Sequence, residues 1–70
     1  MKSPITLHIN GTAQTFSQTL TVAELIEQLK LQGKRLAIEL NGEIVPRSTH
    51  HDTILNELDK VEIIHAVGGG

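Results

Sequence analysis

The sequence of 70 residues contains no cysteine, and Phe16 is its single residue among Phe, Trp and Tyr. Without cysteine the chain cannot form a disulfide or a thiolate metal site, so packing alone must stabilise its fold. The net charge is only -2, and charges of both signs are interspersed along the chain. A nucleic-acid-binding domain of this size usually has a basic face and stacking aromatic residues. We therefore expect no nucleic-acid partner.

Long apolar segments are also missing from this sequence. Residues 1–4 lead directly into a short alternating segment without the apolar core of a signal peptide. No apolar run approaches the length that is needed to cross a membrane. The sequence therefore predicts a cytoplasmic protein that has no membrane partner.

The first segment with a clear periodicity covers residues 5–9. Apolar and polar residues alternate there, which is the period of a strand with one buried face. Asn10 and Gly11 follow, and this pair favours the positive φ angles of a tight hairpin turn. We therefore expect a second, antiparallel strand from about Thr12 to Phe16.

A helix is predicted to begin after Thr21. Thr21 and Glu24 match a capping box, in which each side chain accepts a hydrogen bond from the other residue's backbone amide. Gly33 stands where a left-handed helix stop is expected, so the helix should end near Leu31 or Gln32. Its apolar face is formed by Val22, Leu25, Ile26 and Leu29.

Strand periodicity returns after this helix. Residues 36–40 alternate again, Asn41-Gly42 offers a second tight turn, and residues 43–45 form a short strand that Pro46 should end. Residues 48–56 are interpreted as a surface connection with one helical turn around Ile54 and Leu55.

The last strand is predicted over residues 61–67, with Val61 and Ile63 facing one side and Ile64 the other. The predicted order is therefore two strands, one helix and three strands. One helix with a single apolar face needs a sheet to cover. The sequence thus favours an α+β class, a ubiquitin-like β-grasp fold with a mixed sheet of four to five strands on one main helix. We expect a single domain over residues 1–67 and a flexible glycine tail over residues 68–70.

The glycine tail is the most unusual chemical feature of the sequence. Gly68, Gly69 and Gly70 follow an apolar strand, so the C-terminal carboxylate is expected to be unhindered. Three extended residues reach about 10 Å beyond the strand. A tail without side chains can enter a slot that is too narrow for other residues.

Two sequence segments are similar to a known family. Residues 40–47, Leu-Asn-Gly-Glu-Ile-Val-Pro-Arg, and residues 67–70, Val-Gly-Gly-Gly, resemble the ubiquitin-like sulfur carriers, most closely those of thiamine thiazole biosynthesis. The resemblance covers nearly the whole chain. One departure is Leu58, which stands in the turn before the last strand where such carriers often have glycine. This difference leaves the geometry of that turn open.

The resemblance implies a specific chemistry at the C-terminus. Gly70 would be adenylated by a partner enzyme and then converted to a thiocarboxylate, which is a 1-thioglycine modification. Gly69 and Gly68 would thread the partner's channel. The chain itself would bind no cofactor and would be a carrier rather than an enzyme, because ATP and Mg are used by the partner. The implied partners are this adenylating enzyme, a thiazole synthase and a sulfur donor such as a cysteine desulfurase.

Ile64 and Arg47 are the candidate docking residues on the folded body. Ile64 is an outward apolar residue beside the tail, and Arg47 is expected near the same end. His50, His51 and Asp52 are potential metal ligands, but adjacent residues rarely converge on one ion and no further ligand pair has suitable spacing. We therefore predict that these three residues form a solvated loop and that the chain has no metal site.

Two other functional classes remain open from the sequence. The small subunit of molybdopterin synthase and ubiquitin-like protein modifiers have chemically similar tails, and Pro46-Arg47 favours the thiazole pathway over them. A non-carrier β-grasp binding module is the further alternative. An added residue after Gly70 would separate these classes, because a binding module should tolerate it and a carrier should fail.

Overall fold

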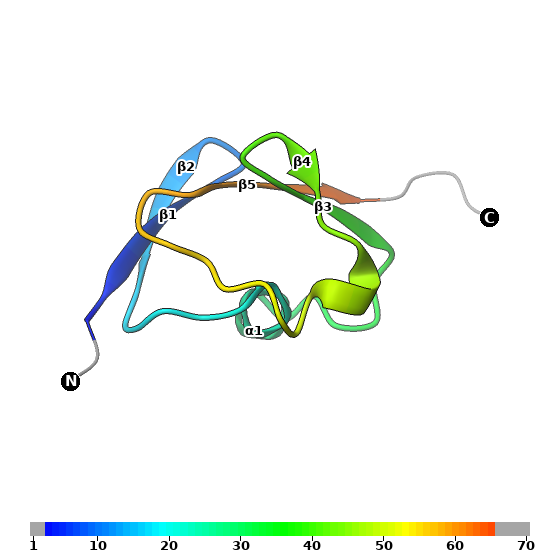
Figure 1. Ribbon diagram of the computed structural model, residues 1–70, viewed down its shortest axis with the longest axis horizontal. Helices are drawn as coiled ribbons and strands as arrows, with labels where there is room; N and C mark the ends of the chain where they lie inside the picture. The colour runs from blue at the N-terminus through cyan, green and yellow to red at the C-terminus, as the bar shows by residue number, and fades with distance from the viewer. Residues whose placement is uncertain (1–2, 66–70) are drawn as a thin grey trace.

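A five-stranded mixed sheet is covered on one face by a single α-helix (Figure 1). The structure is a computed structural model and describes residues 3–65. The strand order across the sheet is β2-β1-β5-β3-β4. The strands are β1 (Ile5–Ile9), β2 (Thr12–Phe16), β3 (Leu36–Leu40), β4 (Glu43–Ile44) and β5 (Lys60–His65). This arrangement confirms the predicted order of elements.

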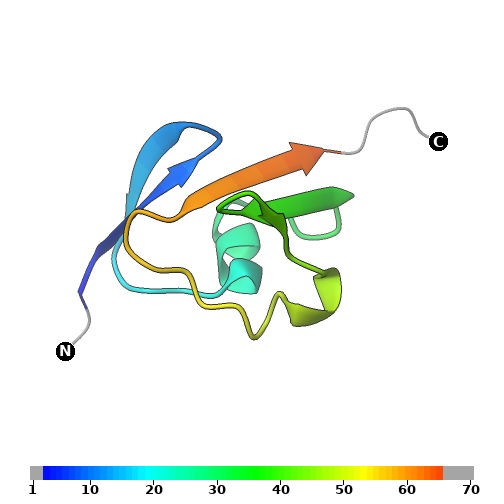
Figure 2. The same ribbon diagram turned by 45° about the horizontal axis from the view of Figure 1, so that its top comes forward.

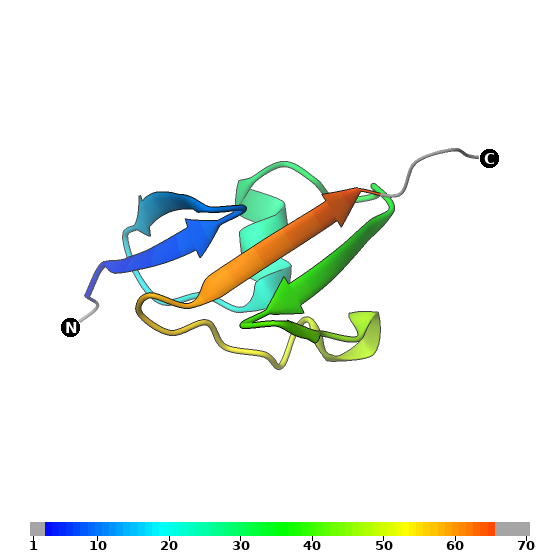
Figure 3. The same ribbon diagram turned by 90° about the horizontal axis from the view of Figure 1, so that it is seen from above.

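Strand β5 occupies the centre of the sheet, between β1 and β3 (Figure 3). It pairs in parallel with β1 and antiparallel with β3. The β1–β2 and β3–β4 pairs are hairpins. Strand β4 is shorter than predicted and ends at Ile44, although the amide of Val45 still donates to the carbonyl of Ile38 (2.8 Å). The predicted end of the last strand, at residues 66–67, lies outside the described residues.

Both hairpin turns have the predicted conformation. The φ angles are 49° at Asn10 and 51° at Asn41, and the following glycines are also positive. Each asparagine side chain additionally binds the central strand. Oδ1 of Asn10 accepts from the amide of Ile63 (2.7 Å), and Oδ1 of Asn41 accepts from the amide of Lys60 (2.9 Å). The two turn residues therefore also hold β5 in the sheet.

Helix α1 (Val22–Gln28) begins with the predicted capping box. The amide of Glu24 donates to Oγ1 of Thr21 (3.1 Å), and the amide of Thr21 donates to Oε1 of Glu24 (2.8 Å). A cap of this kind contributes about 1 kcal/mol. Because the signal is local, the start of the helix follows directly from the sequence.

The end of α1 differs from the prediction. The helix stops at Gln28, and Lys30 takes the left-handed conformation with a φ of 60°. The amide of Lys30 donates to the carbonyl of Glu27 (3.0 Å), and that of Leu31 donates to Ile26 (2.9 Å). These two bonds form a Schellman motif, in which the left-handed position is usually glycine.

The predicted helix stop at Gly33 was therefore wrong. Gly33 has a φ of 78° but belongs to the next turn, which the amide of Lys34 closes on the carbonyl of Leu31 (3.2 Å). The chain thus reverses at Lys30 and turns again at Gly33 before it enters β3.

The connection between β4 and β5 is more buried than predicted. Its helical turn is the 3-10 helix η1 (Arg47–Thr49), rather than a turn around Ile54 and Leu55. The side chain of Leu55 is fully buried, and its amide donates to the carbonyl of Leu20 (2.9 Å). Ile54 forms an isolated bridge with Thr21, so this segment runs beside α1 (Figure 2). The connection therefore contributes Leu55 to the core, while most of its other residues are exposed.

The turn before β5 shows how leucine is accommodated at position 58, where the similar carriers often have glycine. Leu58 has a φ of 68°, a conformation that glycine adopts more easily. The amide of Leu58 donates to the carbonyl of Thr6 (2.7 Å), and the amide of Asn56 donates to Oδ2 of Asp59 (2.7 Å). These bonds hold leucine in the left-handed conformation.

The hydrophobic core lies between the inner face of the sheet and α1. Each fully buried aliphatic side chain stabilises the fold by about 1.5 to 3 kcal/mol. The buried apolar residues are Ile5, Leu7, Ile9, Phe16, Leu20, Val22, Leu25, Ile38, Leu55, Val61 and Ile63.

Within residues 3–65, no helix combines the length and the apolar character that crossing a membrane requires.

Candidate functional site

The end of β5 places Ile64 on the outer face of the sheet. Side chains alternate along a strand, so Val61 and Ile63 enter the core while Ile64 points away from α1. Ile64 is 46% exposed and pairs with Ala37 of β3. The predicted orientation of these three residues is confirmed.

Arg47 lies close to Ile64 in space. Both residues line one open depression together with Arg35, Leu36 and Ala37. Leu36 is also the β3 partner of His65, the last residue of β5. The structure therefore brings the two candidate docking residues together at the end of the sheet where β5 stops. We call Arg35, Leu36, Arg47, Ile64 and His65 the exit end.

Arg35 is a member of this site that the sequence did not single out. It lies directly before β3 and is exposed. The available signal was the basic pair Lys34-Arg35, which follows the end of the predicted helix; α1 ends at Gln28, too far away for its dipole to explain this pair. Only the pairing of β3 with β5 places Arg35 beside Ile64.

The turn that carries Arg47 is held against the helix by His50. The amide of His50 donates to the carbonyl of Arg47 (3.2 Å), and its ring Nε2 donates to the carbonyl of Val45 (3.1 Å). The carbonyl of His50 accepts from the amide of Ala23 (3.0 Å). His50 is 9% exposed, so the prediction of a solvated loop was wrong for this residue.

The other two residues of the histidine segment behave differently from His50. His51 and Asp52 are exposed, as expected for a surface loop. Between residues 3 and 65, no group of three or more His, Cys, Asp or Glu side chains could hold a metal ion.

The predicted roles of Gly68, Gly69 and Gly70 concern residues outside the described part of the chain. They therefore stay predictions. Five residues follow His65, and an extended chain of that length spans at most about 17 Å. Any protein that binds Gly70 must consequently approach the exit end closely.

Comparisons with known proteins identify the family. The ThiS family model matches residues 7–70. The sulfur carrier protein ThiS of Bacillus subtilis (strain 168) is 34% identical over 65 residues, which cover 91% of this chain and 98% of that protein. A crystal structure of the thiamine biosynthesis protein ThiS from Geobacter metallireducens aligns with a TM-score of 0.82 and 35% identity, covering 94% of this chain and 100% of the other.

A longer relative contains a similar segment. A thiazole synthase of Paramagnetospirillum magneticum is 41% identical over 64 residues, which cover 91% of this chain but only 20% of that protein. The chain thus spans about a fifth of the length of this relative. From the family match, the full-length relative and the shared architecture, we conclude that the chain belongs to the ThiS family, the sulfur carriers of thiamine biosynthesis, and has their β-grasp fold.

Proposed function

We propose that the chain carries sulfur as a thiocarboxylate on Gly70 and donates it to a thiazole synthase. The family match that continues through residue 70 carries this proposal, because it includes the glycine tail and not only the fold. The terminal carboxylate of Gly70, which we expect to be accessible, is the group on which the sulfur would be held.

Activation of the carboxylate is the first chemical step. A carboxylate is a poor electrophile, since its charge is delocalised and oxide is a very poor leaving group. An oxygen of the Gly70 carboxylate would attack the α-phosphorus of ATP, and pyrophosphate would leave. The product is an acyl adenylate. ATP and Mg would be held by the adenylating partner, so the chain is a substrate in this step rather than an enzyme.

Sulfur transfer follows from the acyl adenylate. A cysteine desulfurase is the class of enzyme that would supply this sulfur, as a persulfide on a cysteine of the donor or the partner. The terminal sulfur of the persulfide would attack the acyl carbon, and the carbon–oxygen bond to AMP would break. A second thiol of the partner would then reduce the resulting acyl disulfide, which leaves the thiocarboxylate on Gly70 and a disulfide in the partner. The chain has no cysteine, so no internal thiol competes for the activated carbonyl.

Donation of the sulfur requires a second partner. The thiazole synthase of Paramagnetospirillum magneticum includes a segment that is similar to this chain. Linking two partners in one polypeptide raises their effective concentration for each other. This supports a thiazole synthase as the acceptor of sulfur from the separate carrier as well.

The exit end is the proposed docking surface for the adenylating partner. Ile64 is apolar and exposed, and Arg47 lies in the same depression. Both are close to the strand from which the tail continues. A partner that binds the tail can therefore contact these side chains at the same time.

The alternatives differ in what they require of Gly70. A molybdopterin synthase subunit or a protein modifier would use the same carboxylate, and the family match to thiamine biosynthesis favours the thiazole pathway over both. A non-carrier binding module would not need the carboxylate at all.

An alanine appended after Gly70 tests the carrier against the binding module. We expect the extended chain to fold normally and to release no pyrophosphate from ATP with a matching adenylating enzyme, because the carboxylate is displaced from the partner's active site. The matched control carries the same alanine before Met1 and should react like the unmodified chain. Equal pyrophosphate release from the two extended chains would contradict a role of Gly70 in the reaction.

A further inference from the structure

Basic residues are concentrated in one part of this slightly acidic protein. Between residues 3 and 65 the chain has five Lys and Arg residues, and four of them lie between the last turn of α1 and η1. The fifth, Lys60, begins β5 at the other end of that strand. The four residues are Lys30, Lys34, Arg35 and Arg47.

Three of these cations surround two neighbouring depressions. Lys34, Arg35 and Arg47 line the depression between the end of α1 and η1, and the two arginines also line the one that contains Ile64. All three side chains are exposed. We call Lys34, Arg35 and Arg47 the basic cluster.

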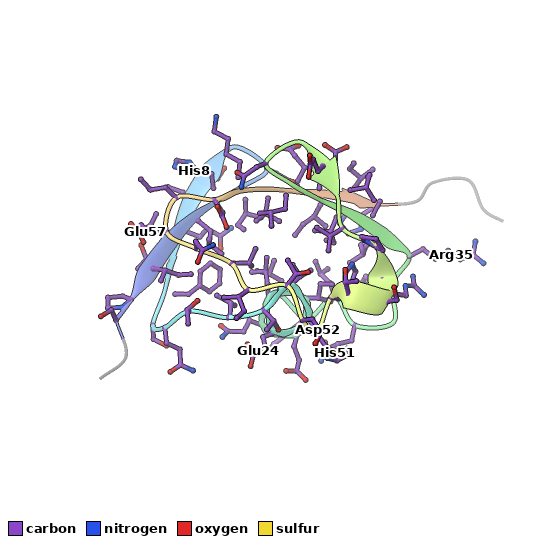
Figure 4. All side chains as sticks on the ribbon, in the orientation of Figure 1. His8, Glu24, Arg35, His51, Asp52 and Glu57 are labelled. Atoms are coloured by element: carbon purple, nitrogen blue, oxygen red, sulfur yellow. The ribbon has the colours of Figure 1, made fainter. Side chains whose placement is uncertain are left out.

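Acidic residues lie mainly elsewhere. Among residues 3–65, no Asp or Glu lines either of the two depressions. Glu24 and Glu27 line a third depression on the helix side, which Arg47 also borders. Figure 4 shows Arg35 extending from the end of the molecule where β5 stops, whereas Glu57 lies at the opposite end. The two depressions at the exit end are therefore lined by cations, with no carboxylate among their described lining residues.

The basic cluster also lies where a tail-binding partner must approach. Leu36 lines both depressions and pairs with His65. The residues after His65 span at most about 17 Å, so the body of the carrier stays at the mouth of any channel that holds Gly70. The surface around that mouth would face the basic cluster.

We propose that the basic cluster docks on an acidic protein surface at the mouth of the adenylating partner's tail channel. This inference rests on the proposed function of Gly70. Opposite charges across an interface accelerate encounter and orient the partners, and an unmatched cation at the contact is costly to desolvate. The cluster would thus align the exit end before the tail enters, while Ile64 supplies the apolar contact.

The test measures kcat/KM for adenylation of the full-length chain between 0.01 and 0.15 M salt. Over this range the Debye length falls from about 30 Å to about 8 Å, so attraction between exposed charges is screened. We expect Arg35→Gln and Lys34→Gln each to lower kcat/KM about threefold to tenfold at low salt, with kcat unchanged. The difference from the unmodified chain should become small at 0.15 M salt.

Lys60→Gln is the matched control, because it removes one exposed positive charge from the opposite end of β5. It should leave kcat/KM nearly unchanged at low salt. An equal loss in Lys60→Gln, or a salt-independent kcat/KM in the unmodified chain, would overturn the basic cluster as a docking surface. Failure of the unmodified chain to be adenylated at all would instead contradict the proposed function.

Discussion

The two ends of strand β5 use their side chains in different ways. At its start, the turn over residues 56–59 is bound by hydrogen bonds from two other segments. Nδ2 of Asn41 donates to Oδ1 of Asp59 (3.0 Å), and the amide of Thr6 donates to Oε1 of Glu57 (2.8 Å). We call this region, with Thr6 and Asn41, the anchored end.

The exit end has a different composition. Arg35 and Arg47 are exposed there beside Ile64, and the depression that they line is open. The anchored end therefore holds the fold, whereas the exit end presents side chains to a partner. If this division is correct, substitutions at the anchored end should change stability, and substitutions at the exit end should change only the reaction with the partner.

Ile64→Asp should give the largest change in the reaction with the partner. The substitution removes an apolar contact and places a negative charge in the basic cluster's interface. We expect kcat/KM for adenylation, measured at a temperature where the variant is fully folded, to fall about tenfold or more, which corresponds to about 1.4 kcal/mol.

The control for Ile64→Asp is Ile54→Asp. Ile54 is similarly exposed, at 59% compared with 46%, but it lies in the connection beside α1. It should react like the unmodified chain. The same loss of kcat/KM in both variants would mean that added negative charge, rather than the position of Ile64, is responsible.

Asn41→Ala tests the anchored end. Alanine loses the side-chain bonds to Asp59 and Lys60 and is strained at a φ of 51°. We expect urea denaturation to show a loss of about 2 kcal/mol in the free energy of unfolding.

Asn41→Gly separates the two causes of this loss, because glycine tolerates the turn but cannot make the side-chain bonds. Its cost should be about 1 kcal/mol. Both variants should keep the normal kcat/KM at a temperature where they are fully folded. A clear loss of kcat/KM in folded Asn41→Ala would argue against the separation of the two ends.

Leu58→Gly should have the smallest effect and should stabilise the protein. Glycine relieves the strain of a φ of 68°, although it also gains more entropy in the unfolded chain. We expect a net gain of about 0.5 to 1 kcal/mol, measured as a melting temperature several degrees higher.

Leu58→Ala keeps the strain while it removes the apolar side chain, so it should not stabilise the protein. If alanine stabilised as much as glycine, the exposure of Leu58 rather than its backbone conformation would be the cause.

The local features of this fold could be predicted from the sequence. The capping box at Thr21 and the turns at Asn10 and Asn41 depend on residues that are neighbours in the chain. The outward position of Ile64 followed from simple alternation, and Arg47 was expected near the same end. The structure confirms the position of each of these features. The role of Ile64 and Arg47 in docking stays a prediction.

Features that depend on tertiary contacts could not be predicted in the same way. Lys30 adopts the left-handed conformation although Gly33 carries the stronger sequence signal, because the Schellman bonds and the packing of Leu31 close the helix earlier. His50 and Leu55 are buried because the connection before β5 runs against α1. Most residues of this connection are polar, so the sequence pattern did not indicate that these two side chains are buried.

The central claim is that Gly70 carries the sulfur, and intact mass spectrometry tests it most directly. The full-length chain would be incubated with ATP, Mg, a matching adenylating enzyme and a sulfur donor, and its fragments would then be sequenced. We predict a gain in mass equal to one exchange of oxygen for sulfur, located at Gly70. The adenylating enzyme would first be shown to modify the carrier of its own organism. With such an active enzyme, an unchanged mass of this chain, or a gain in mass located elsewhere in the chain, would contradict the claim.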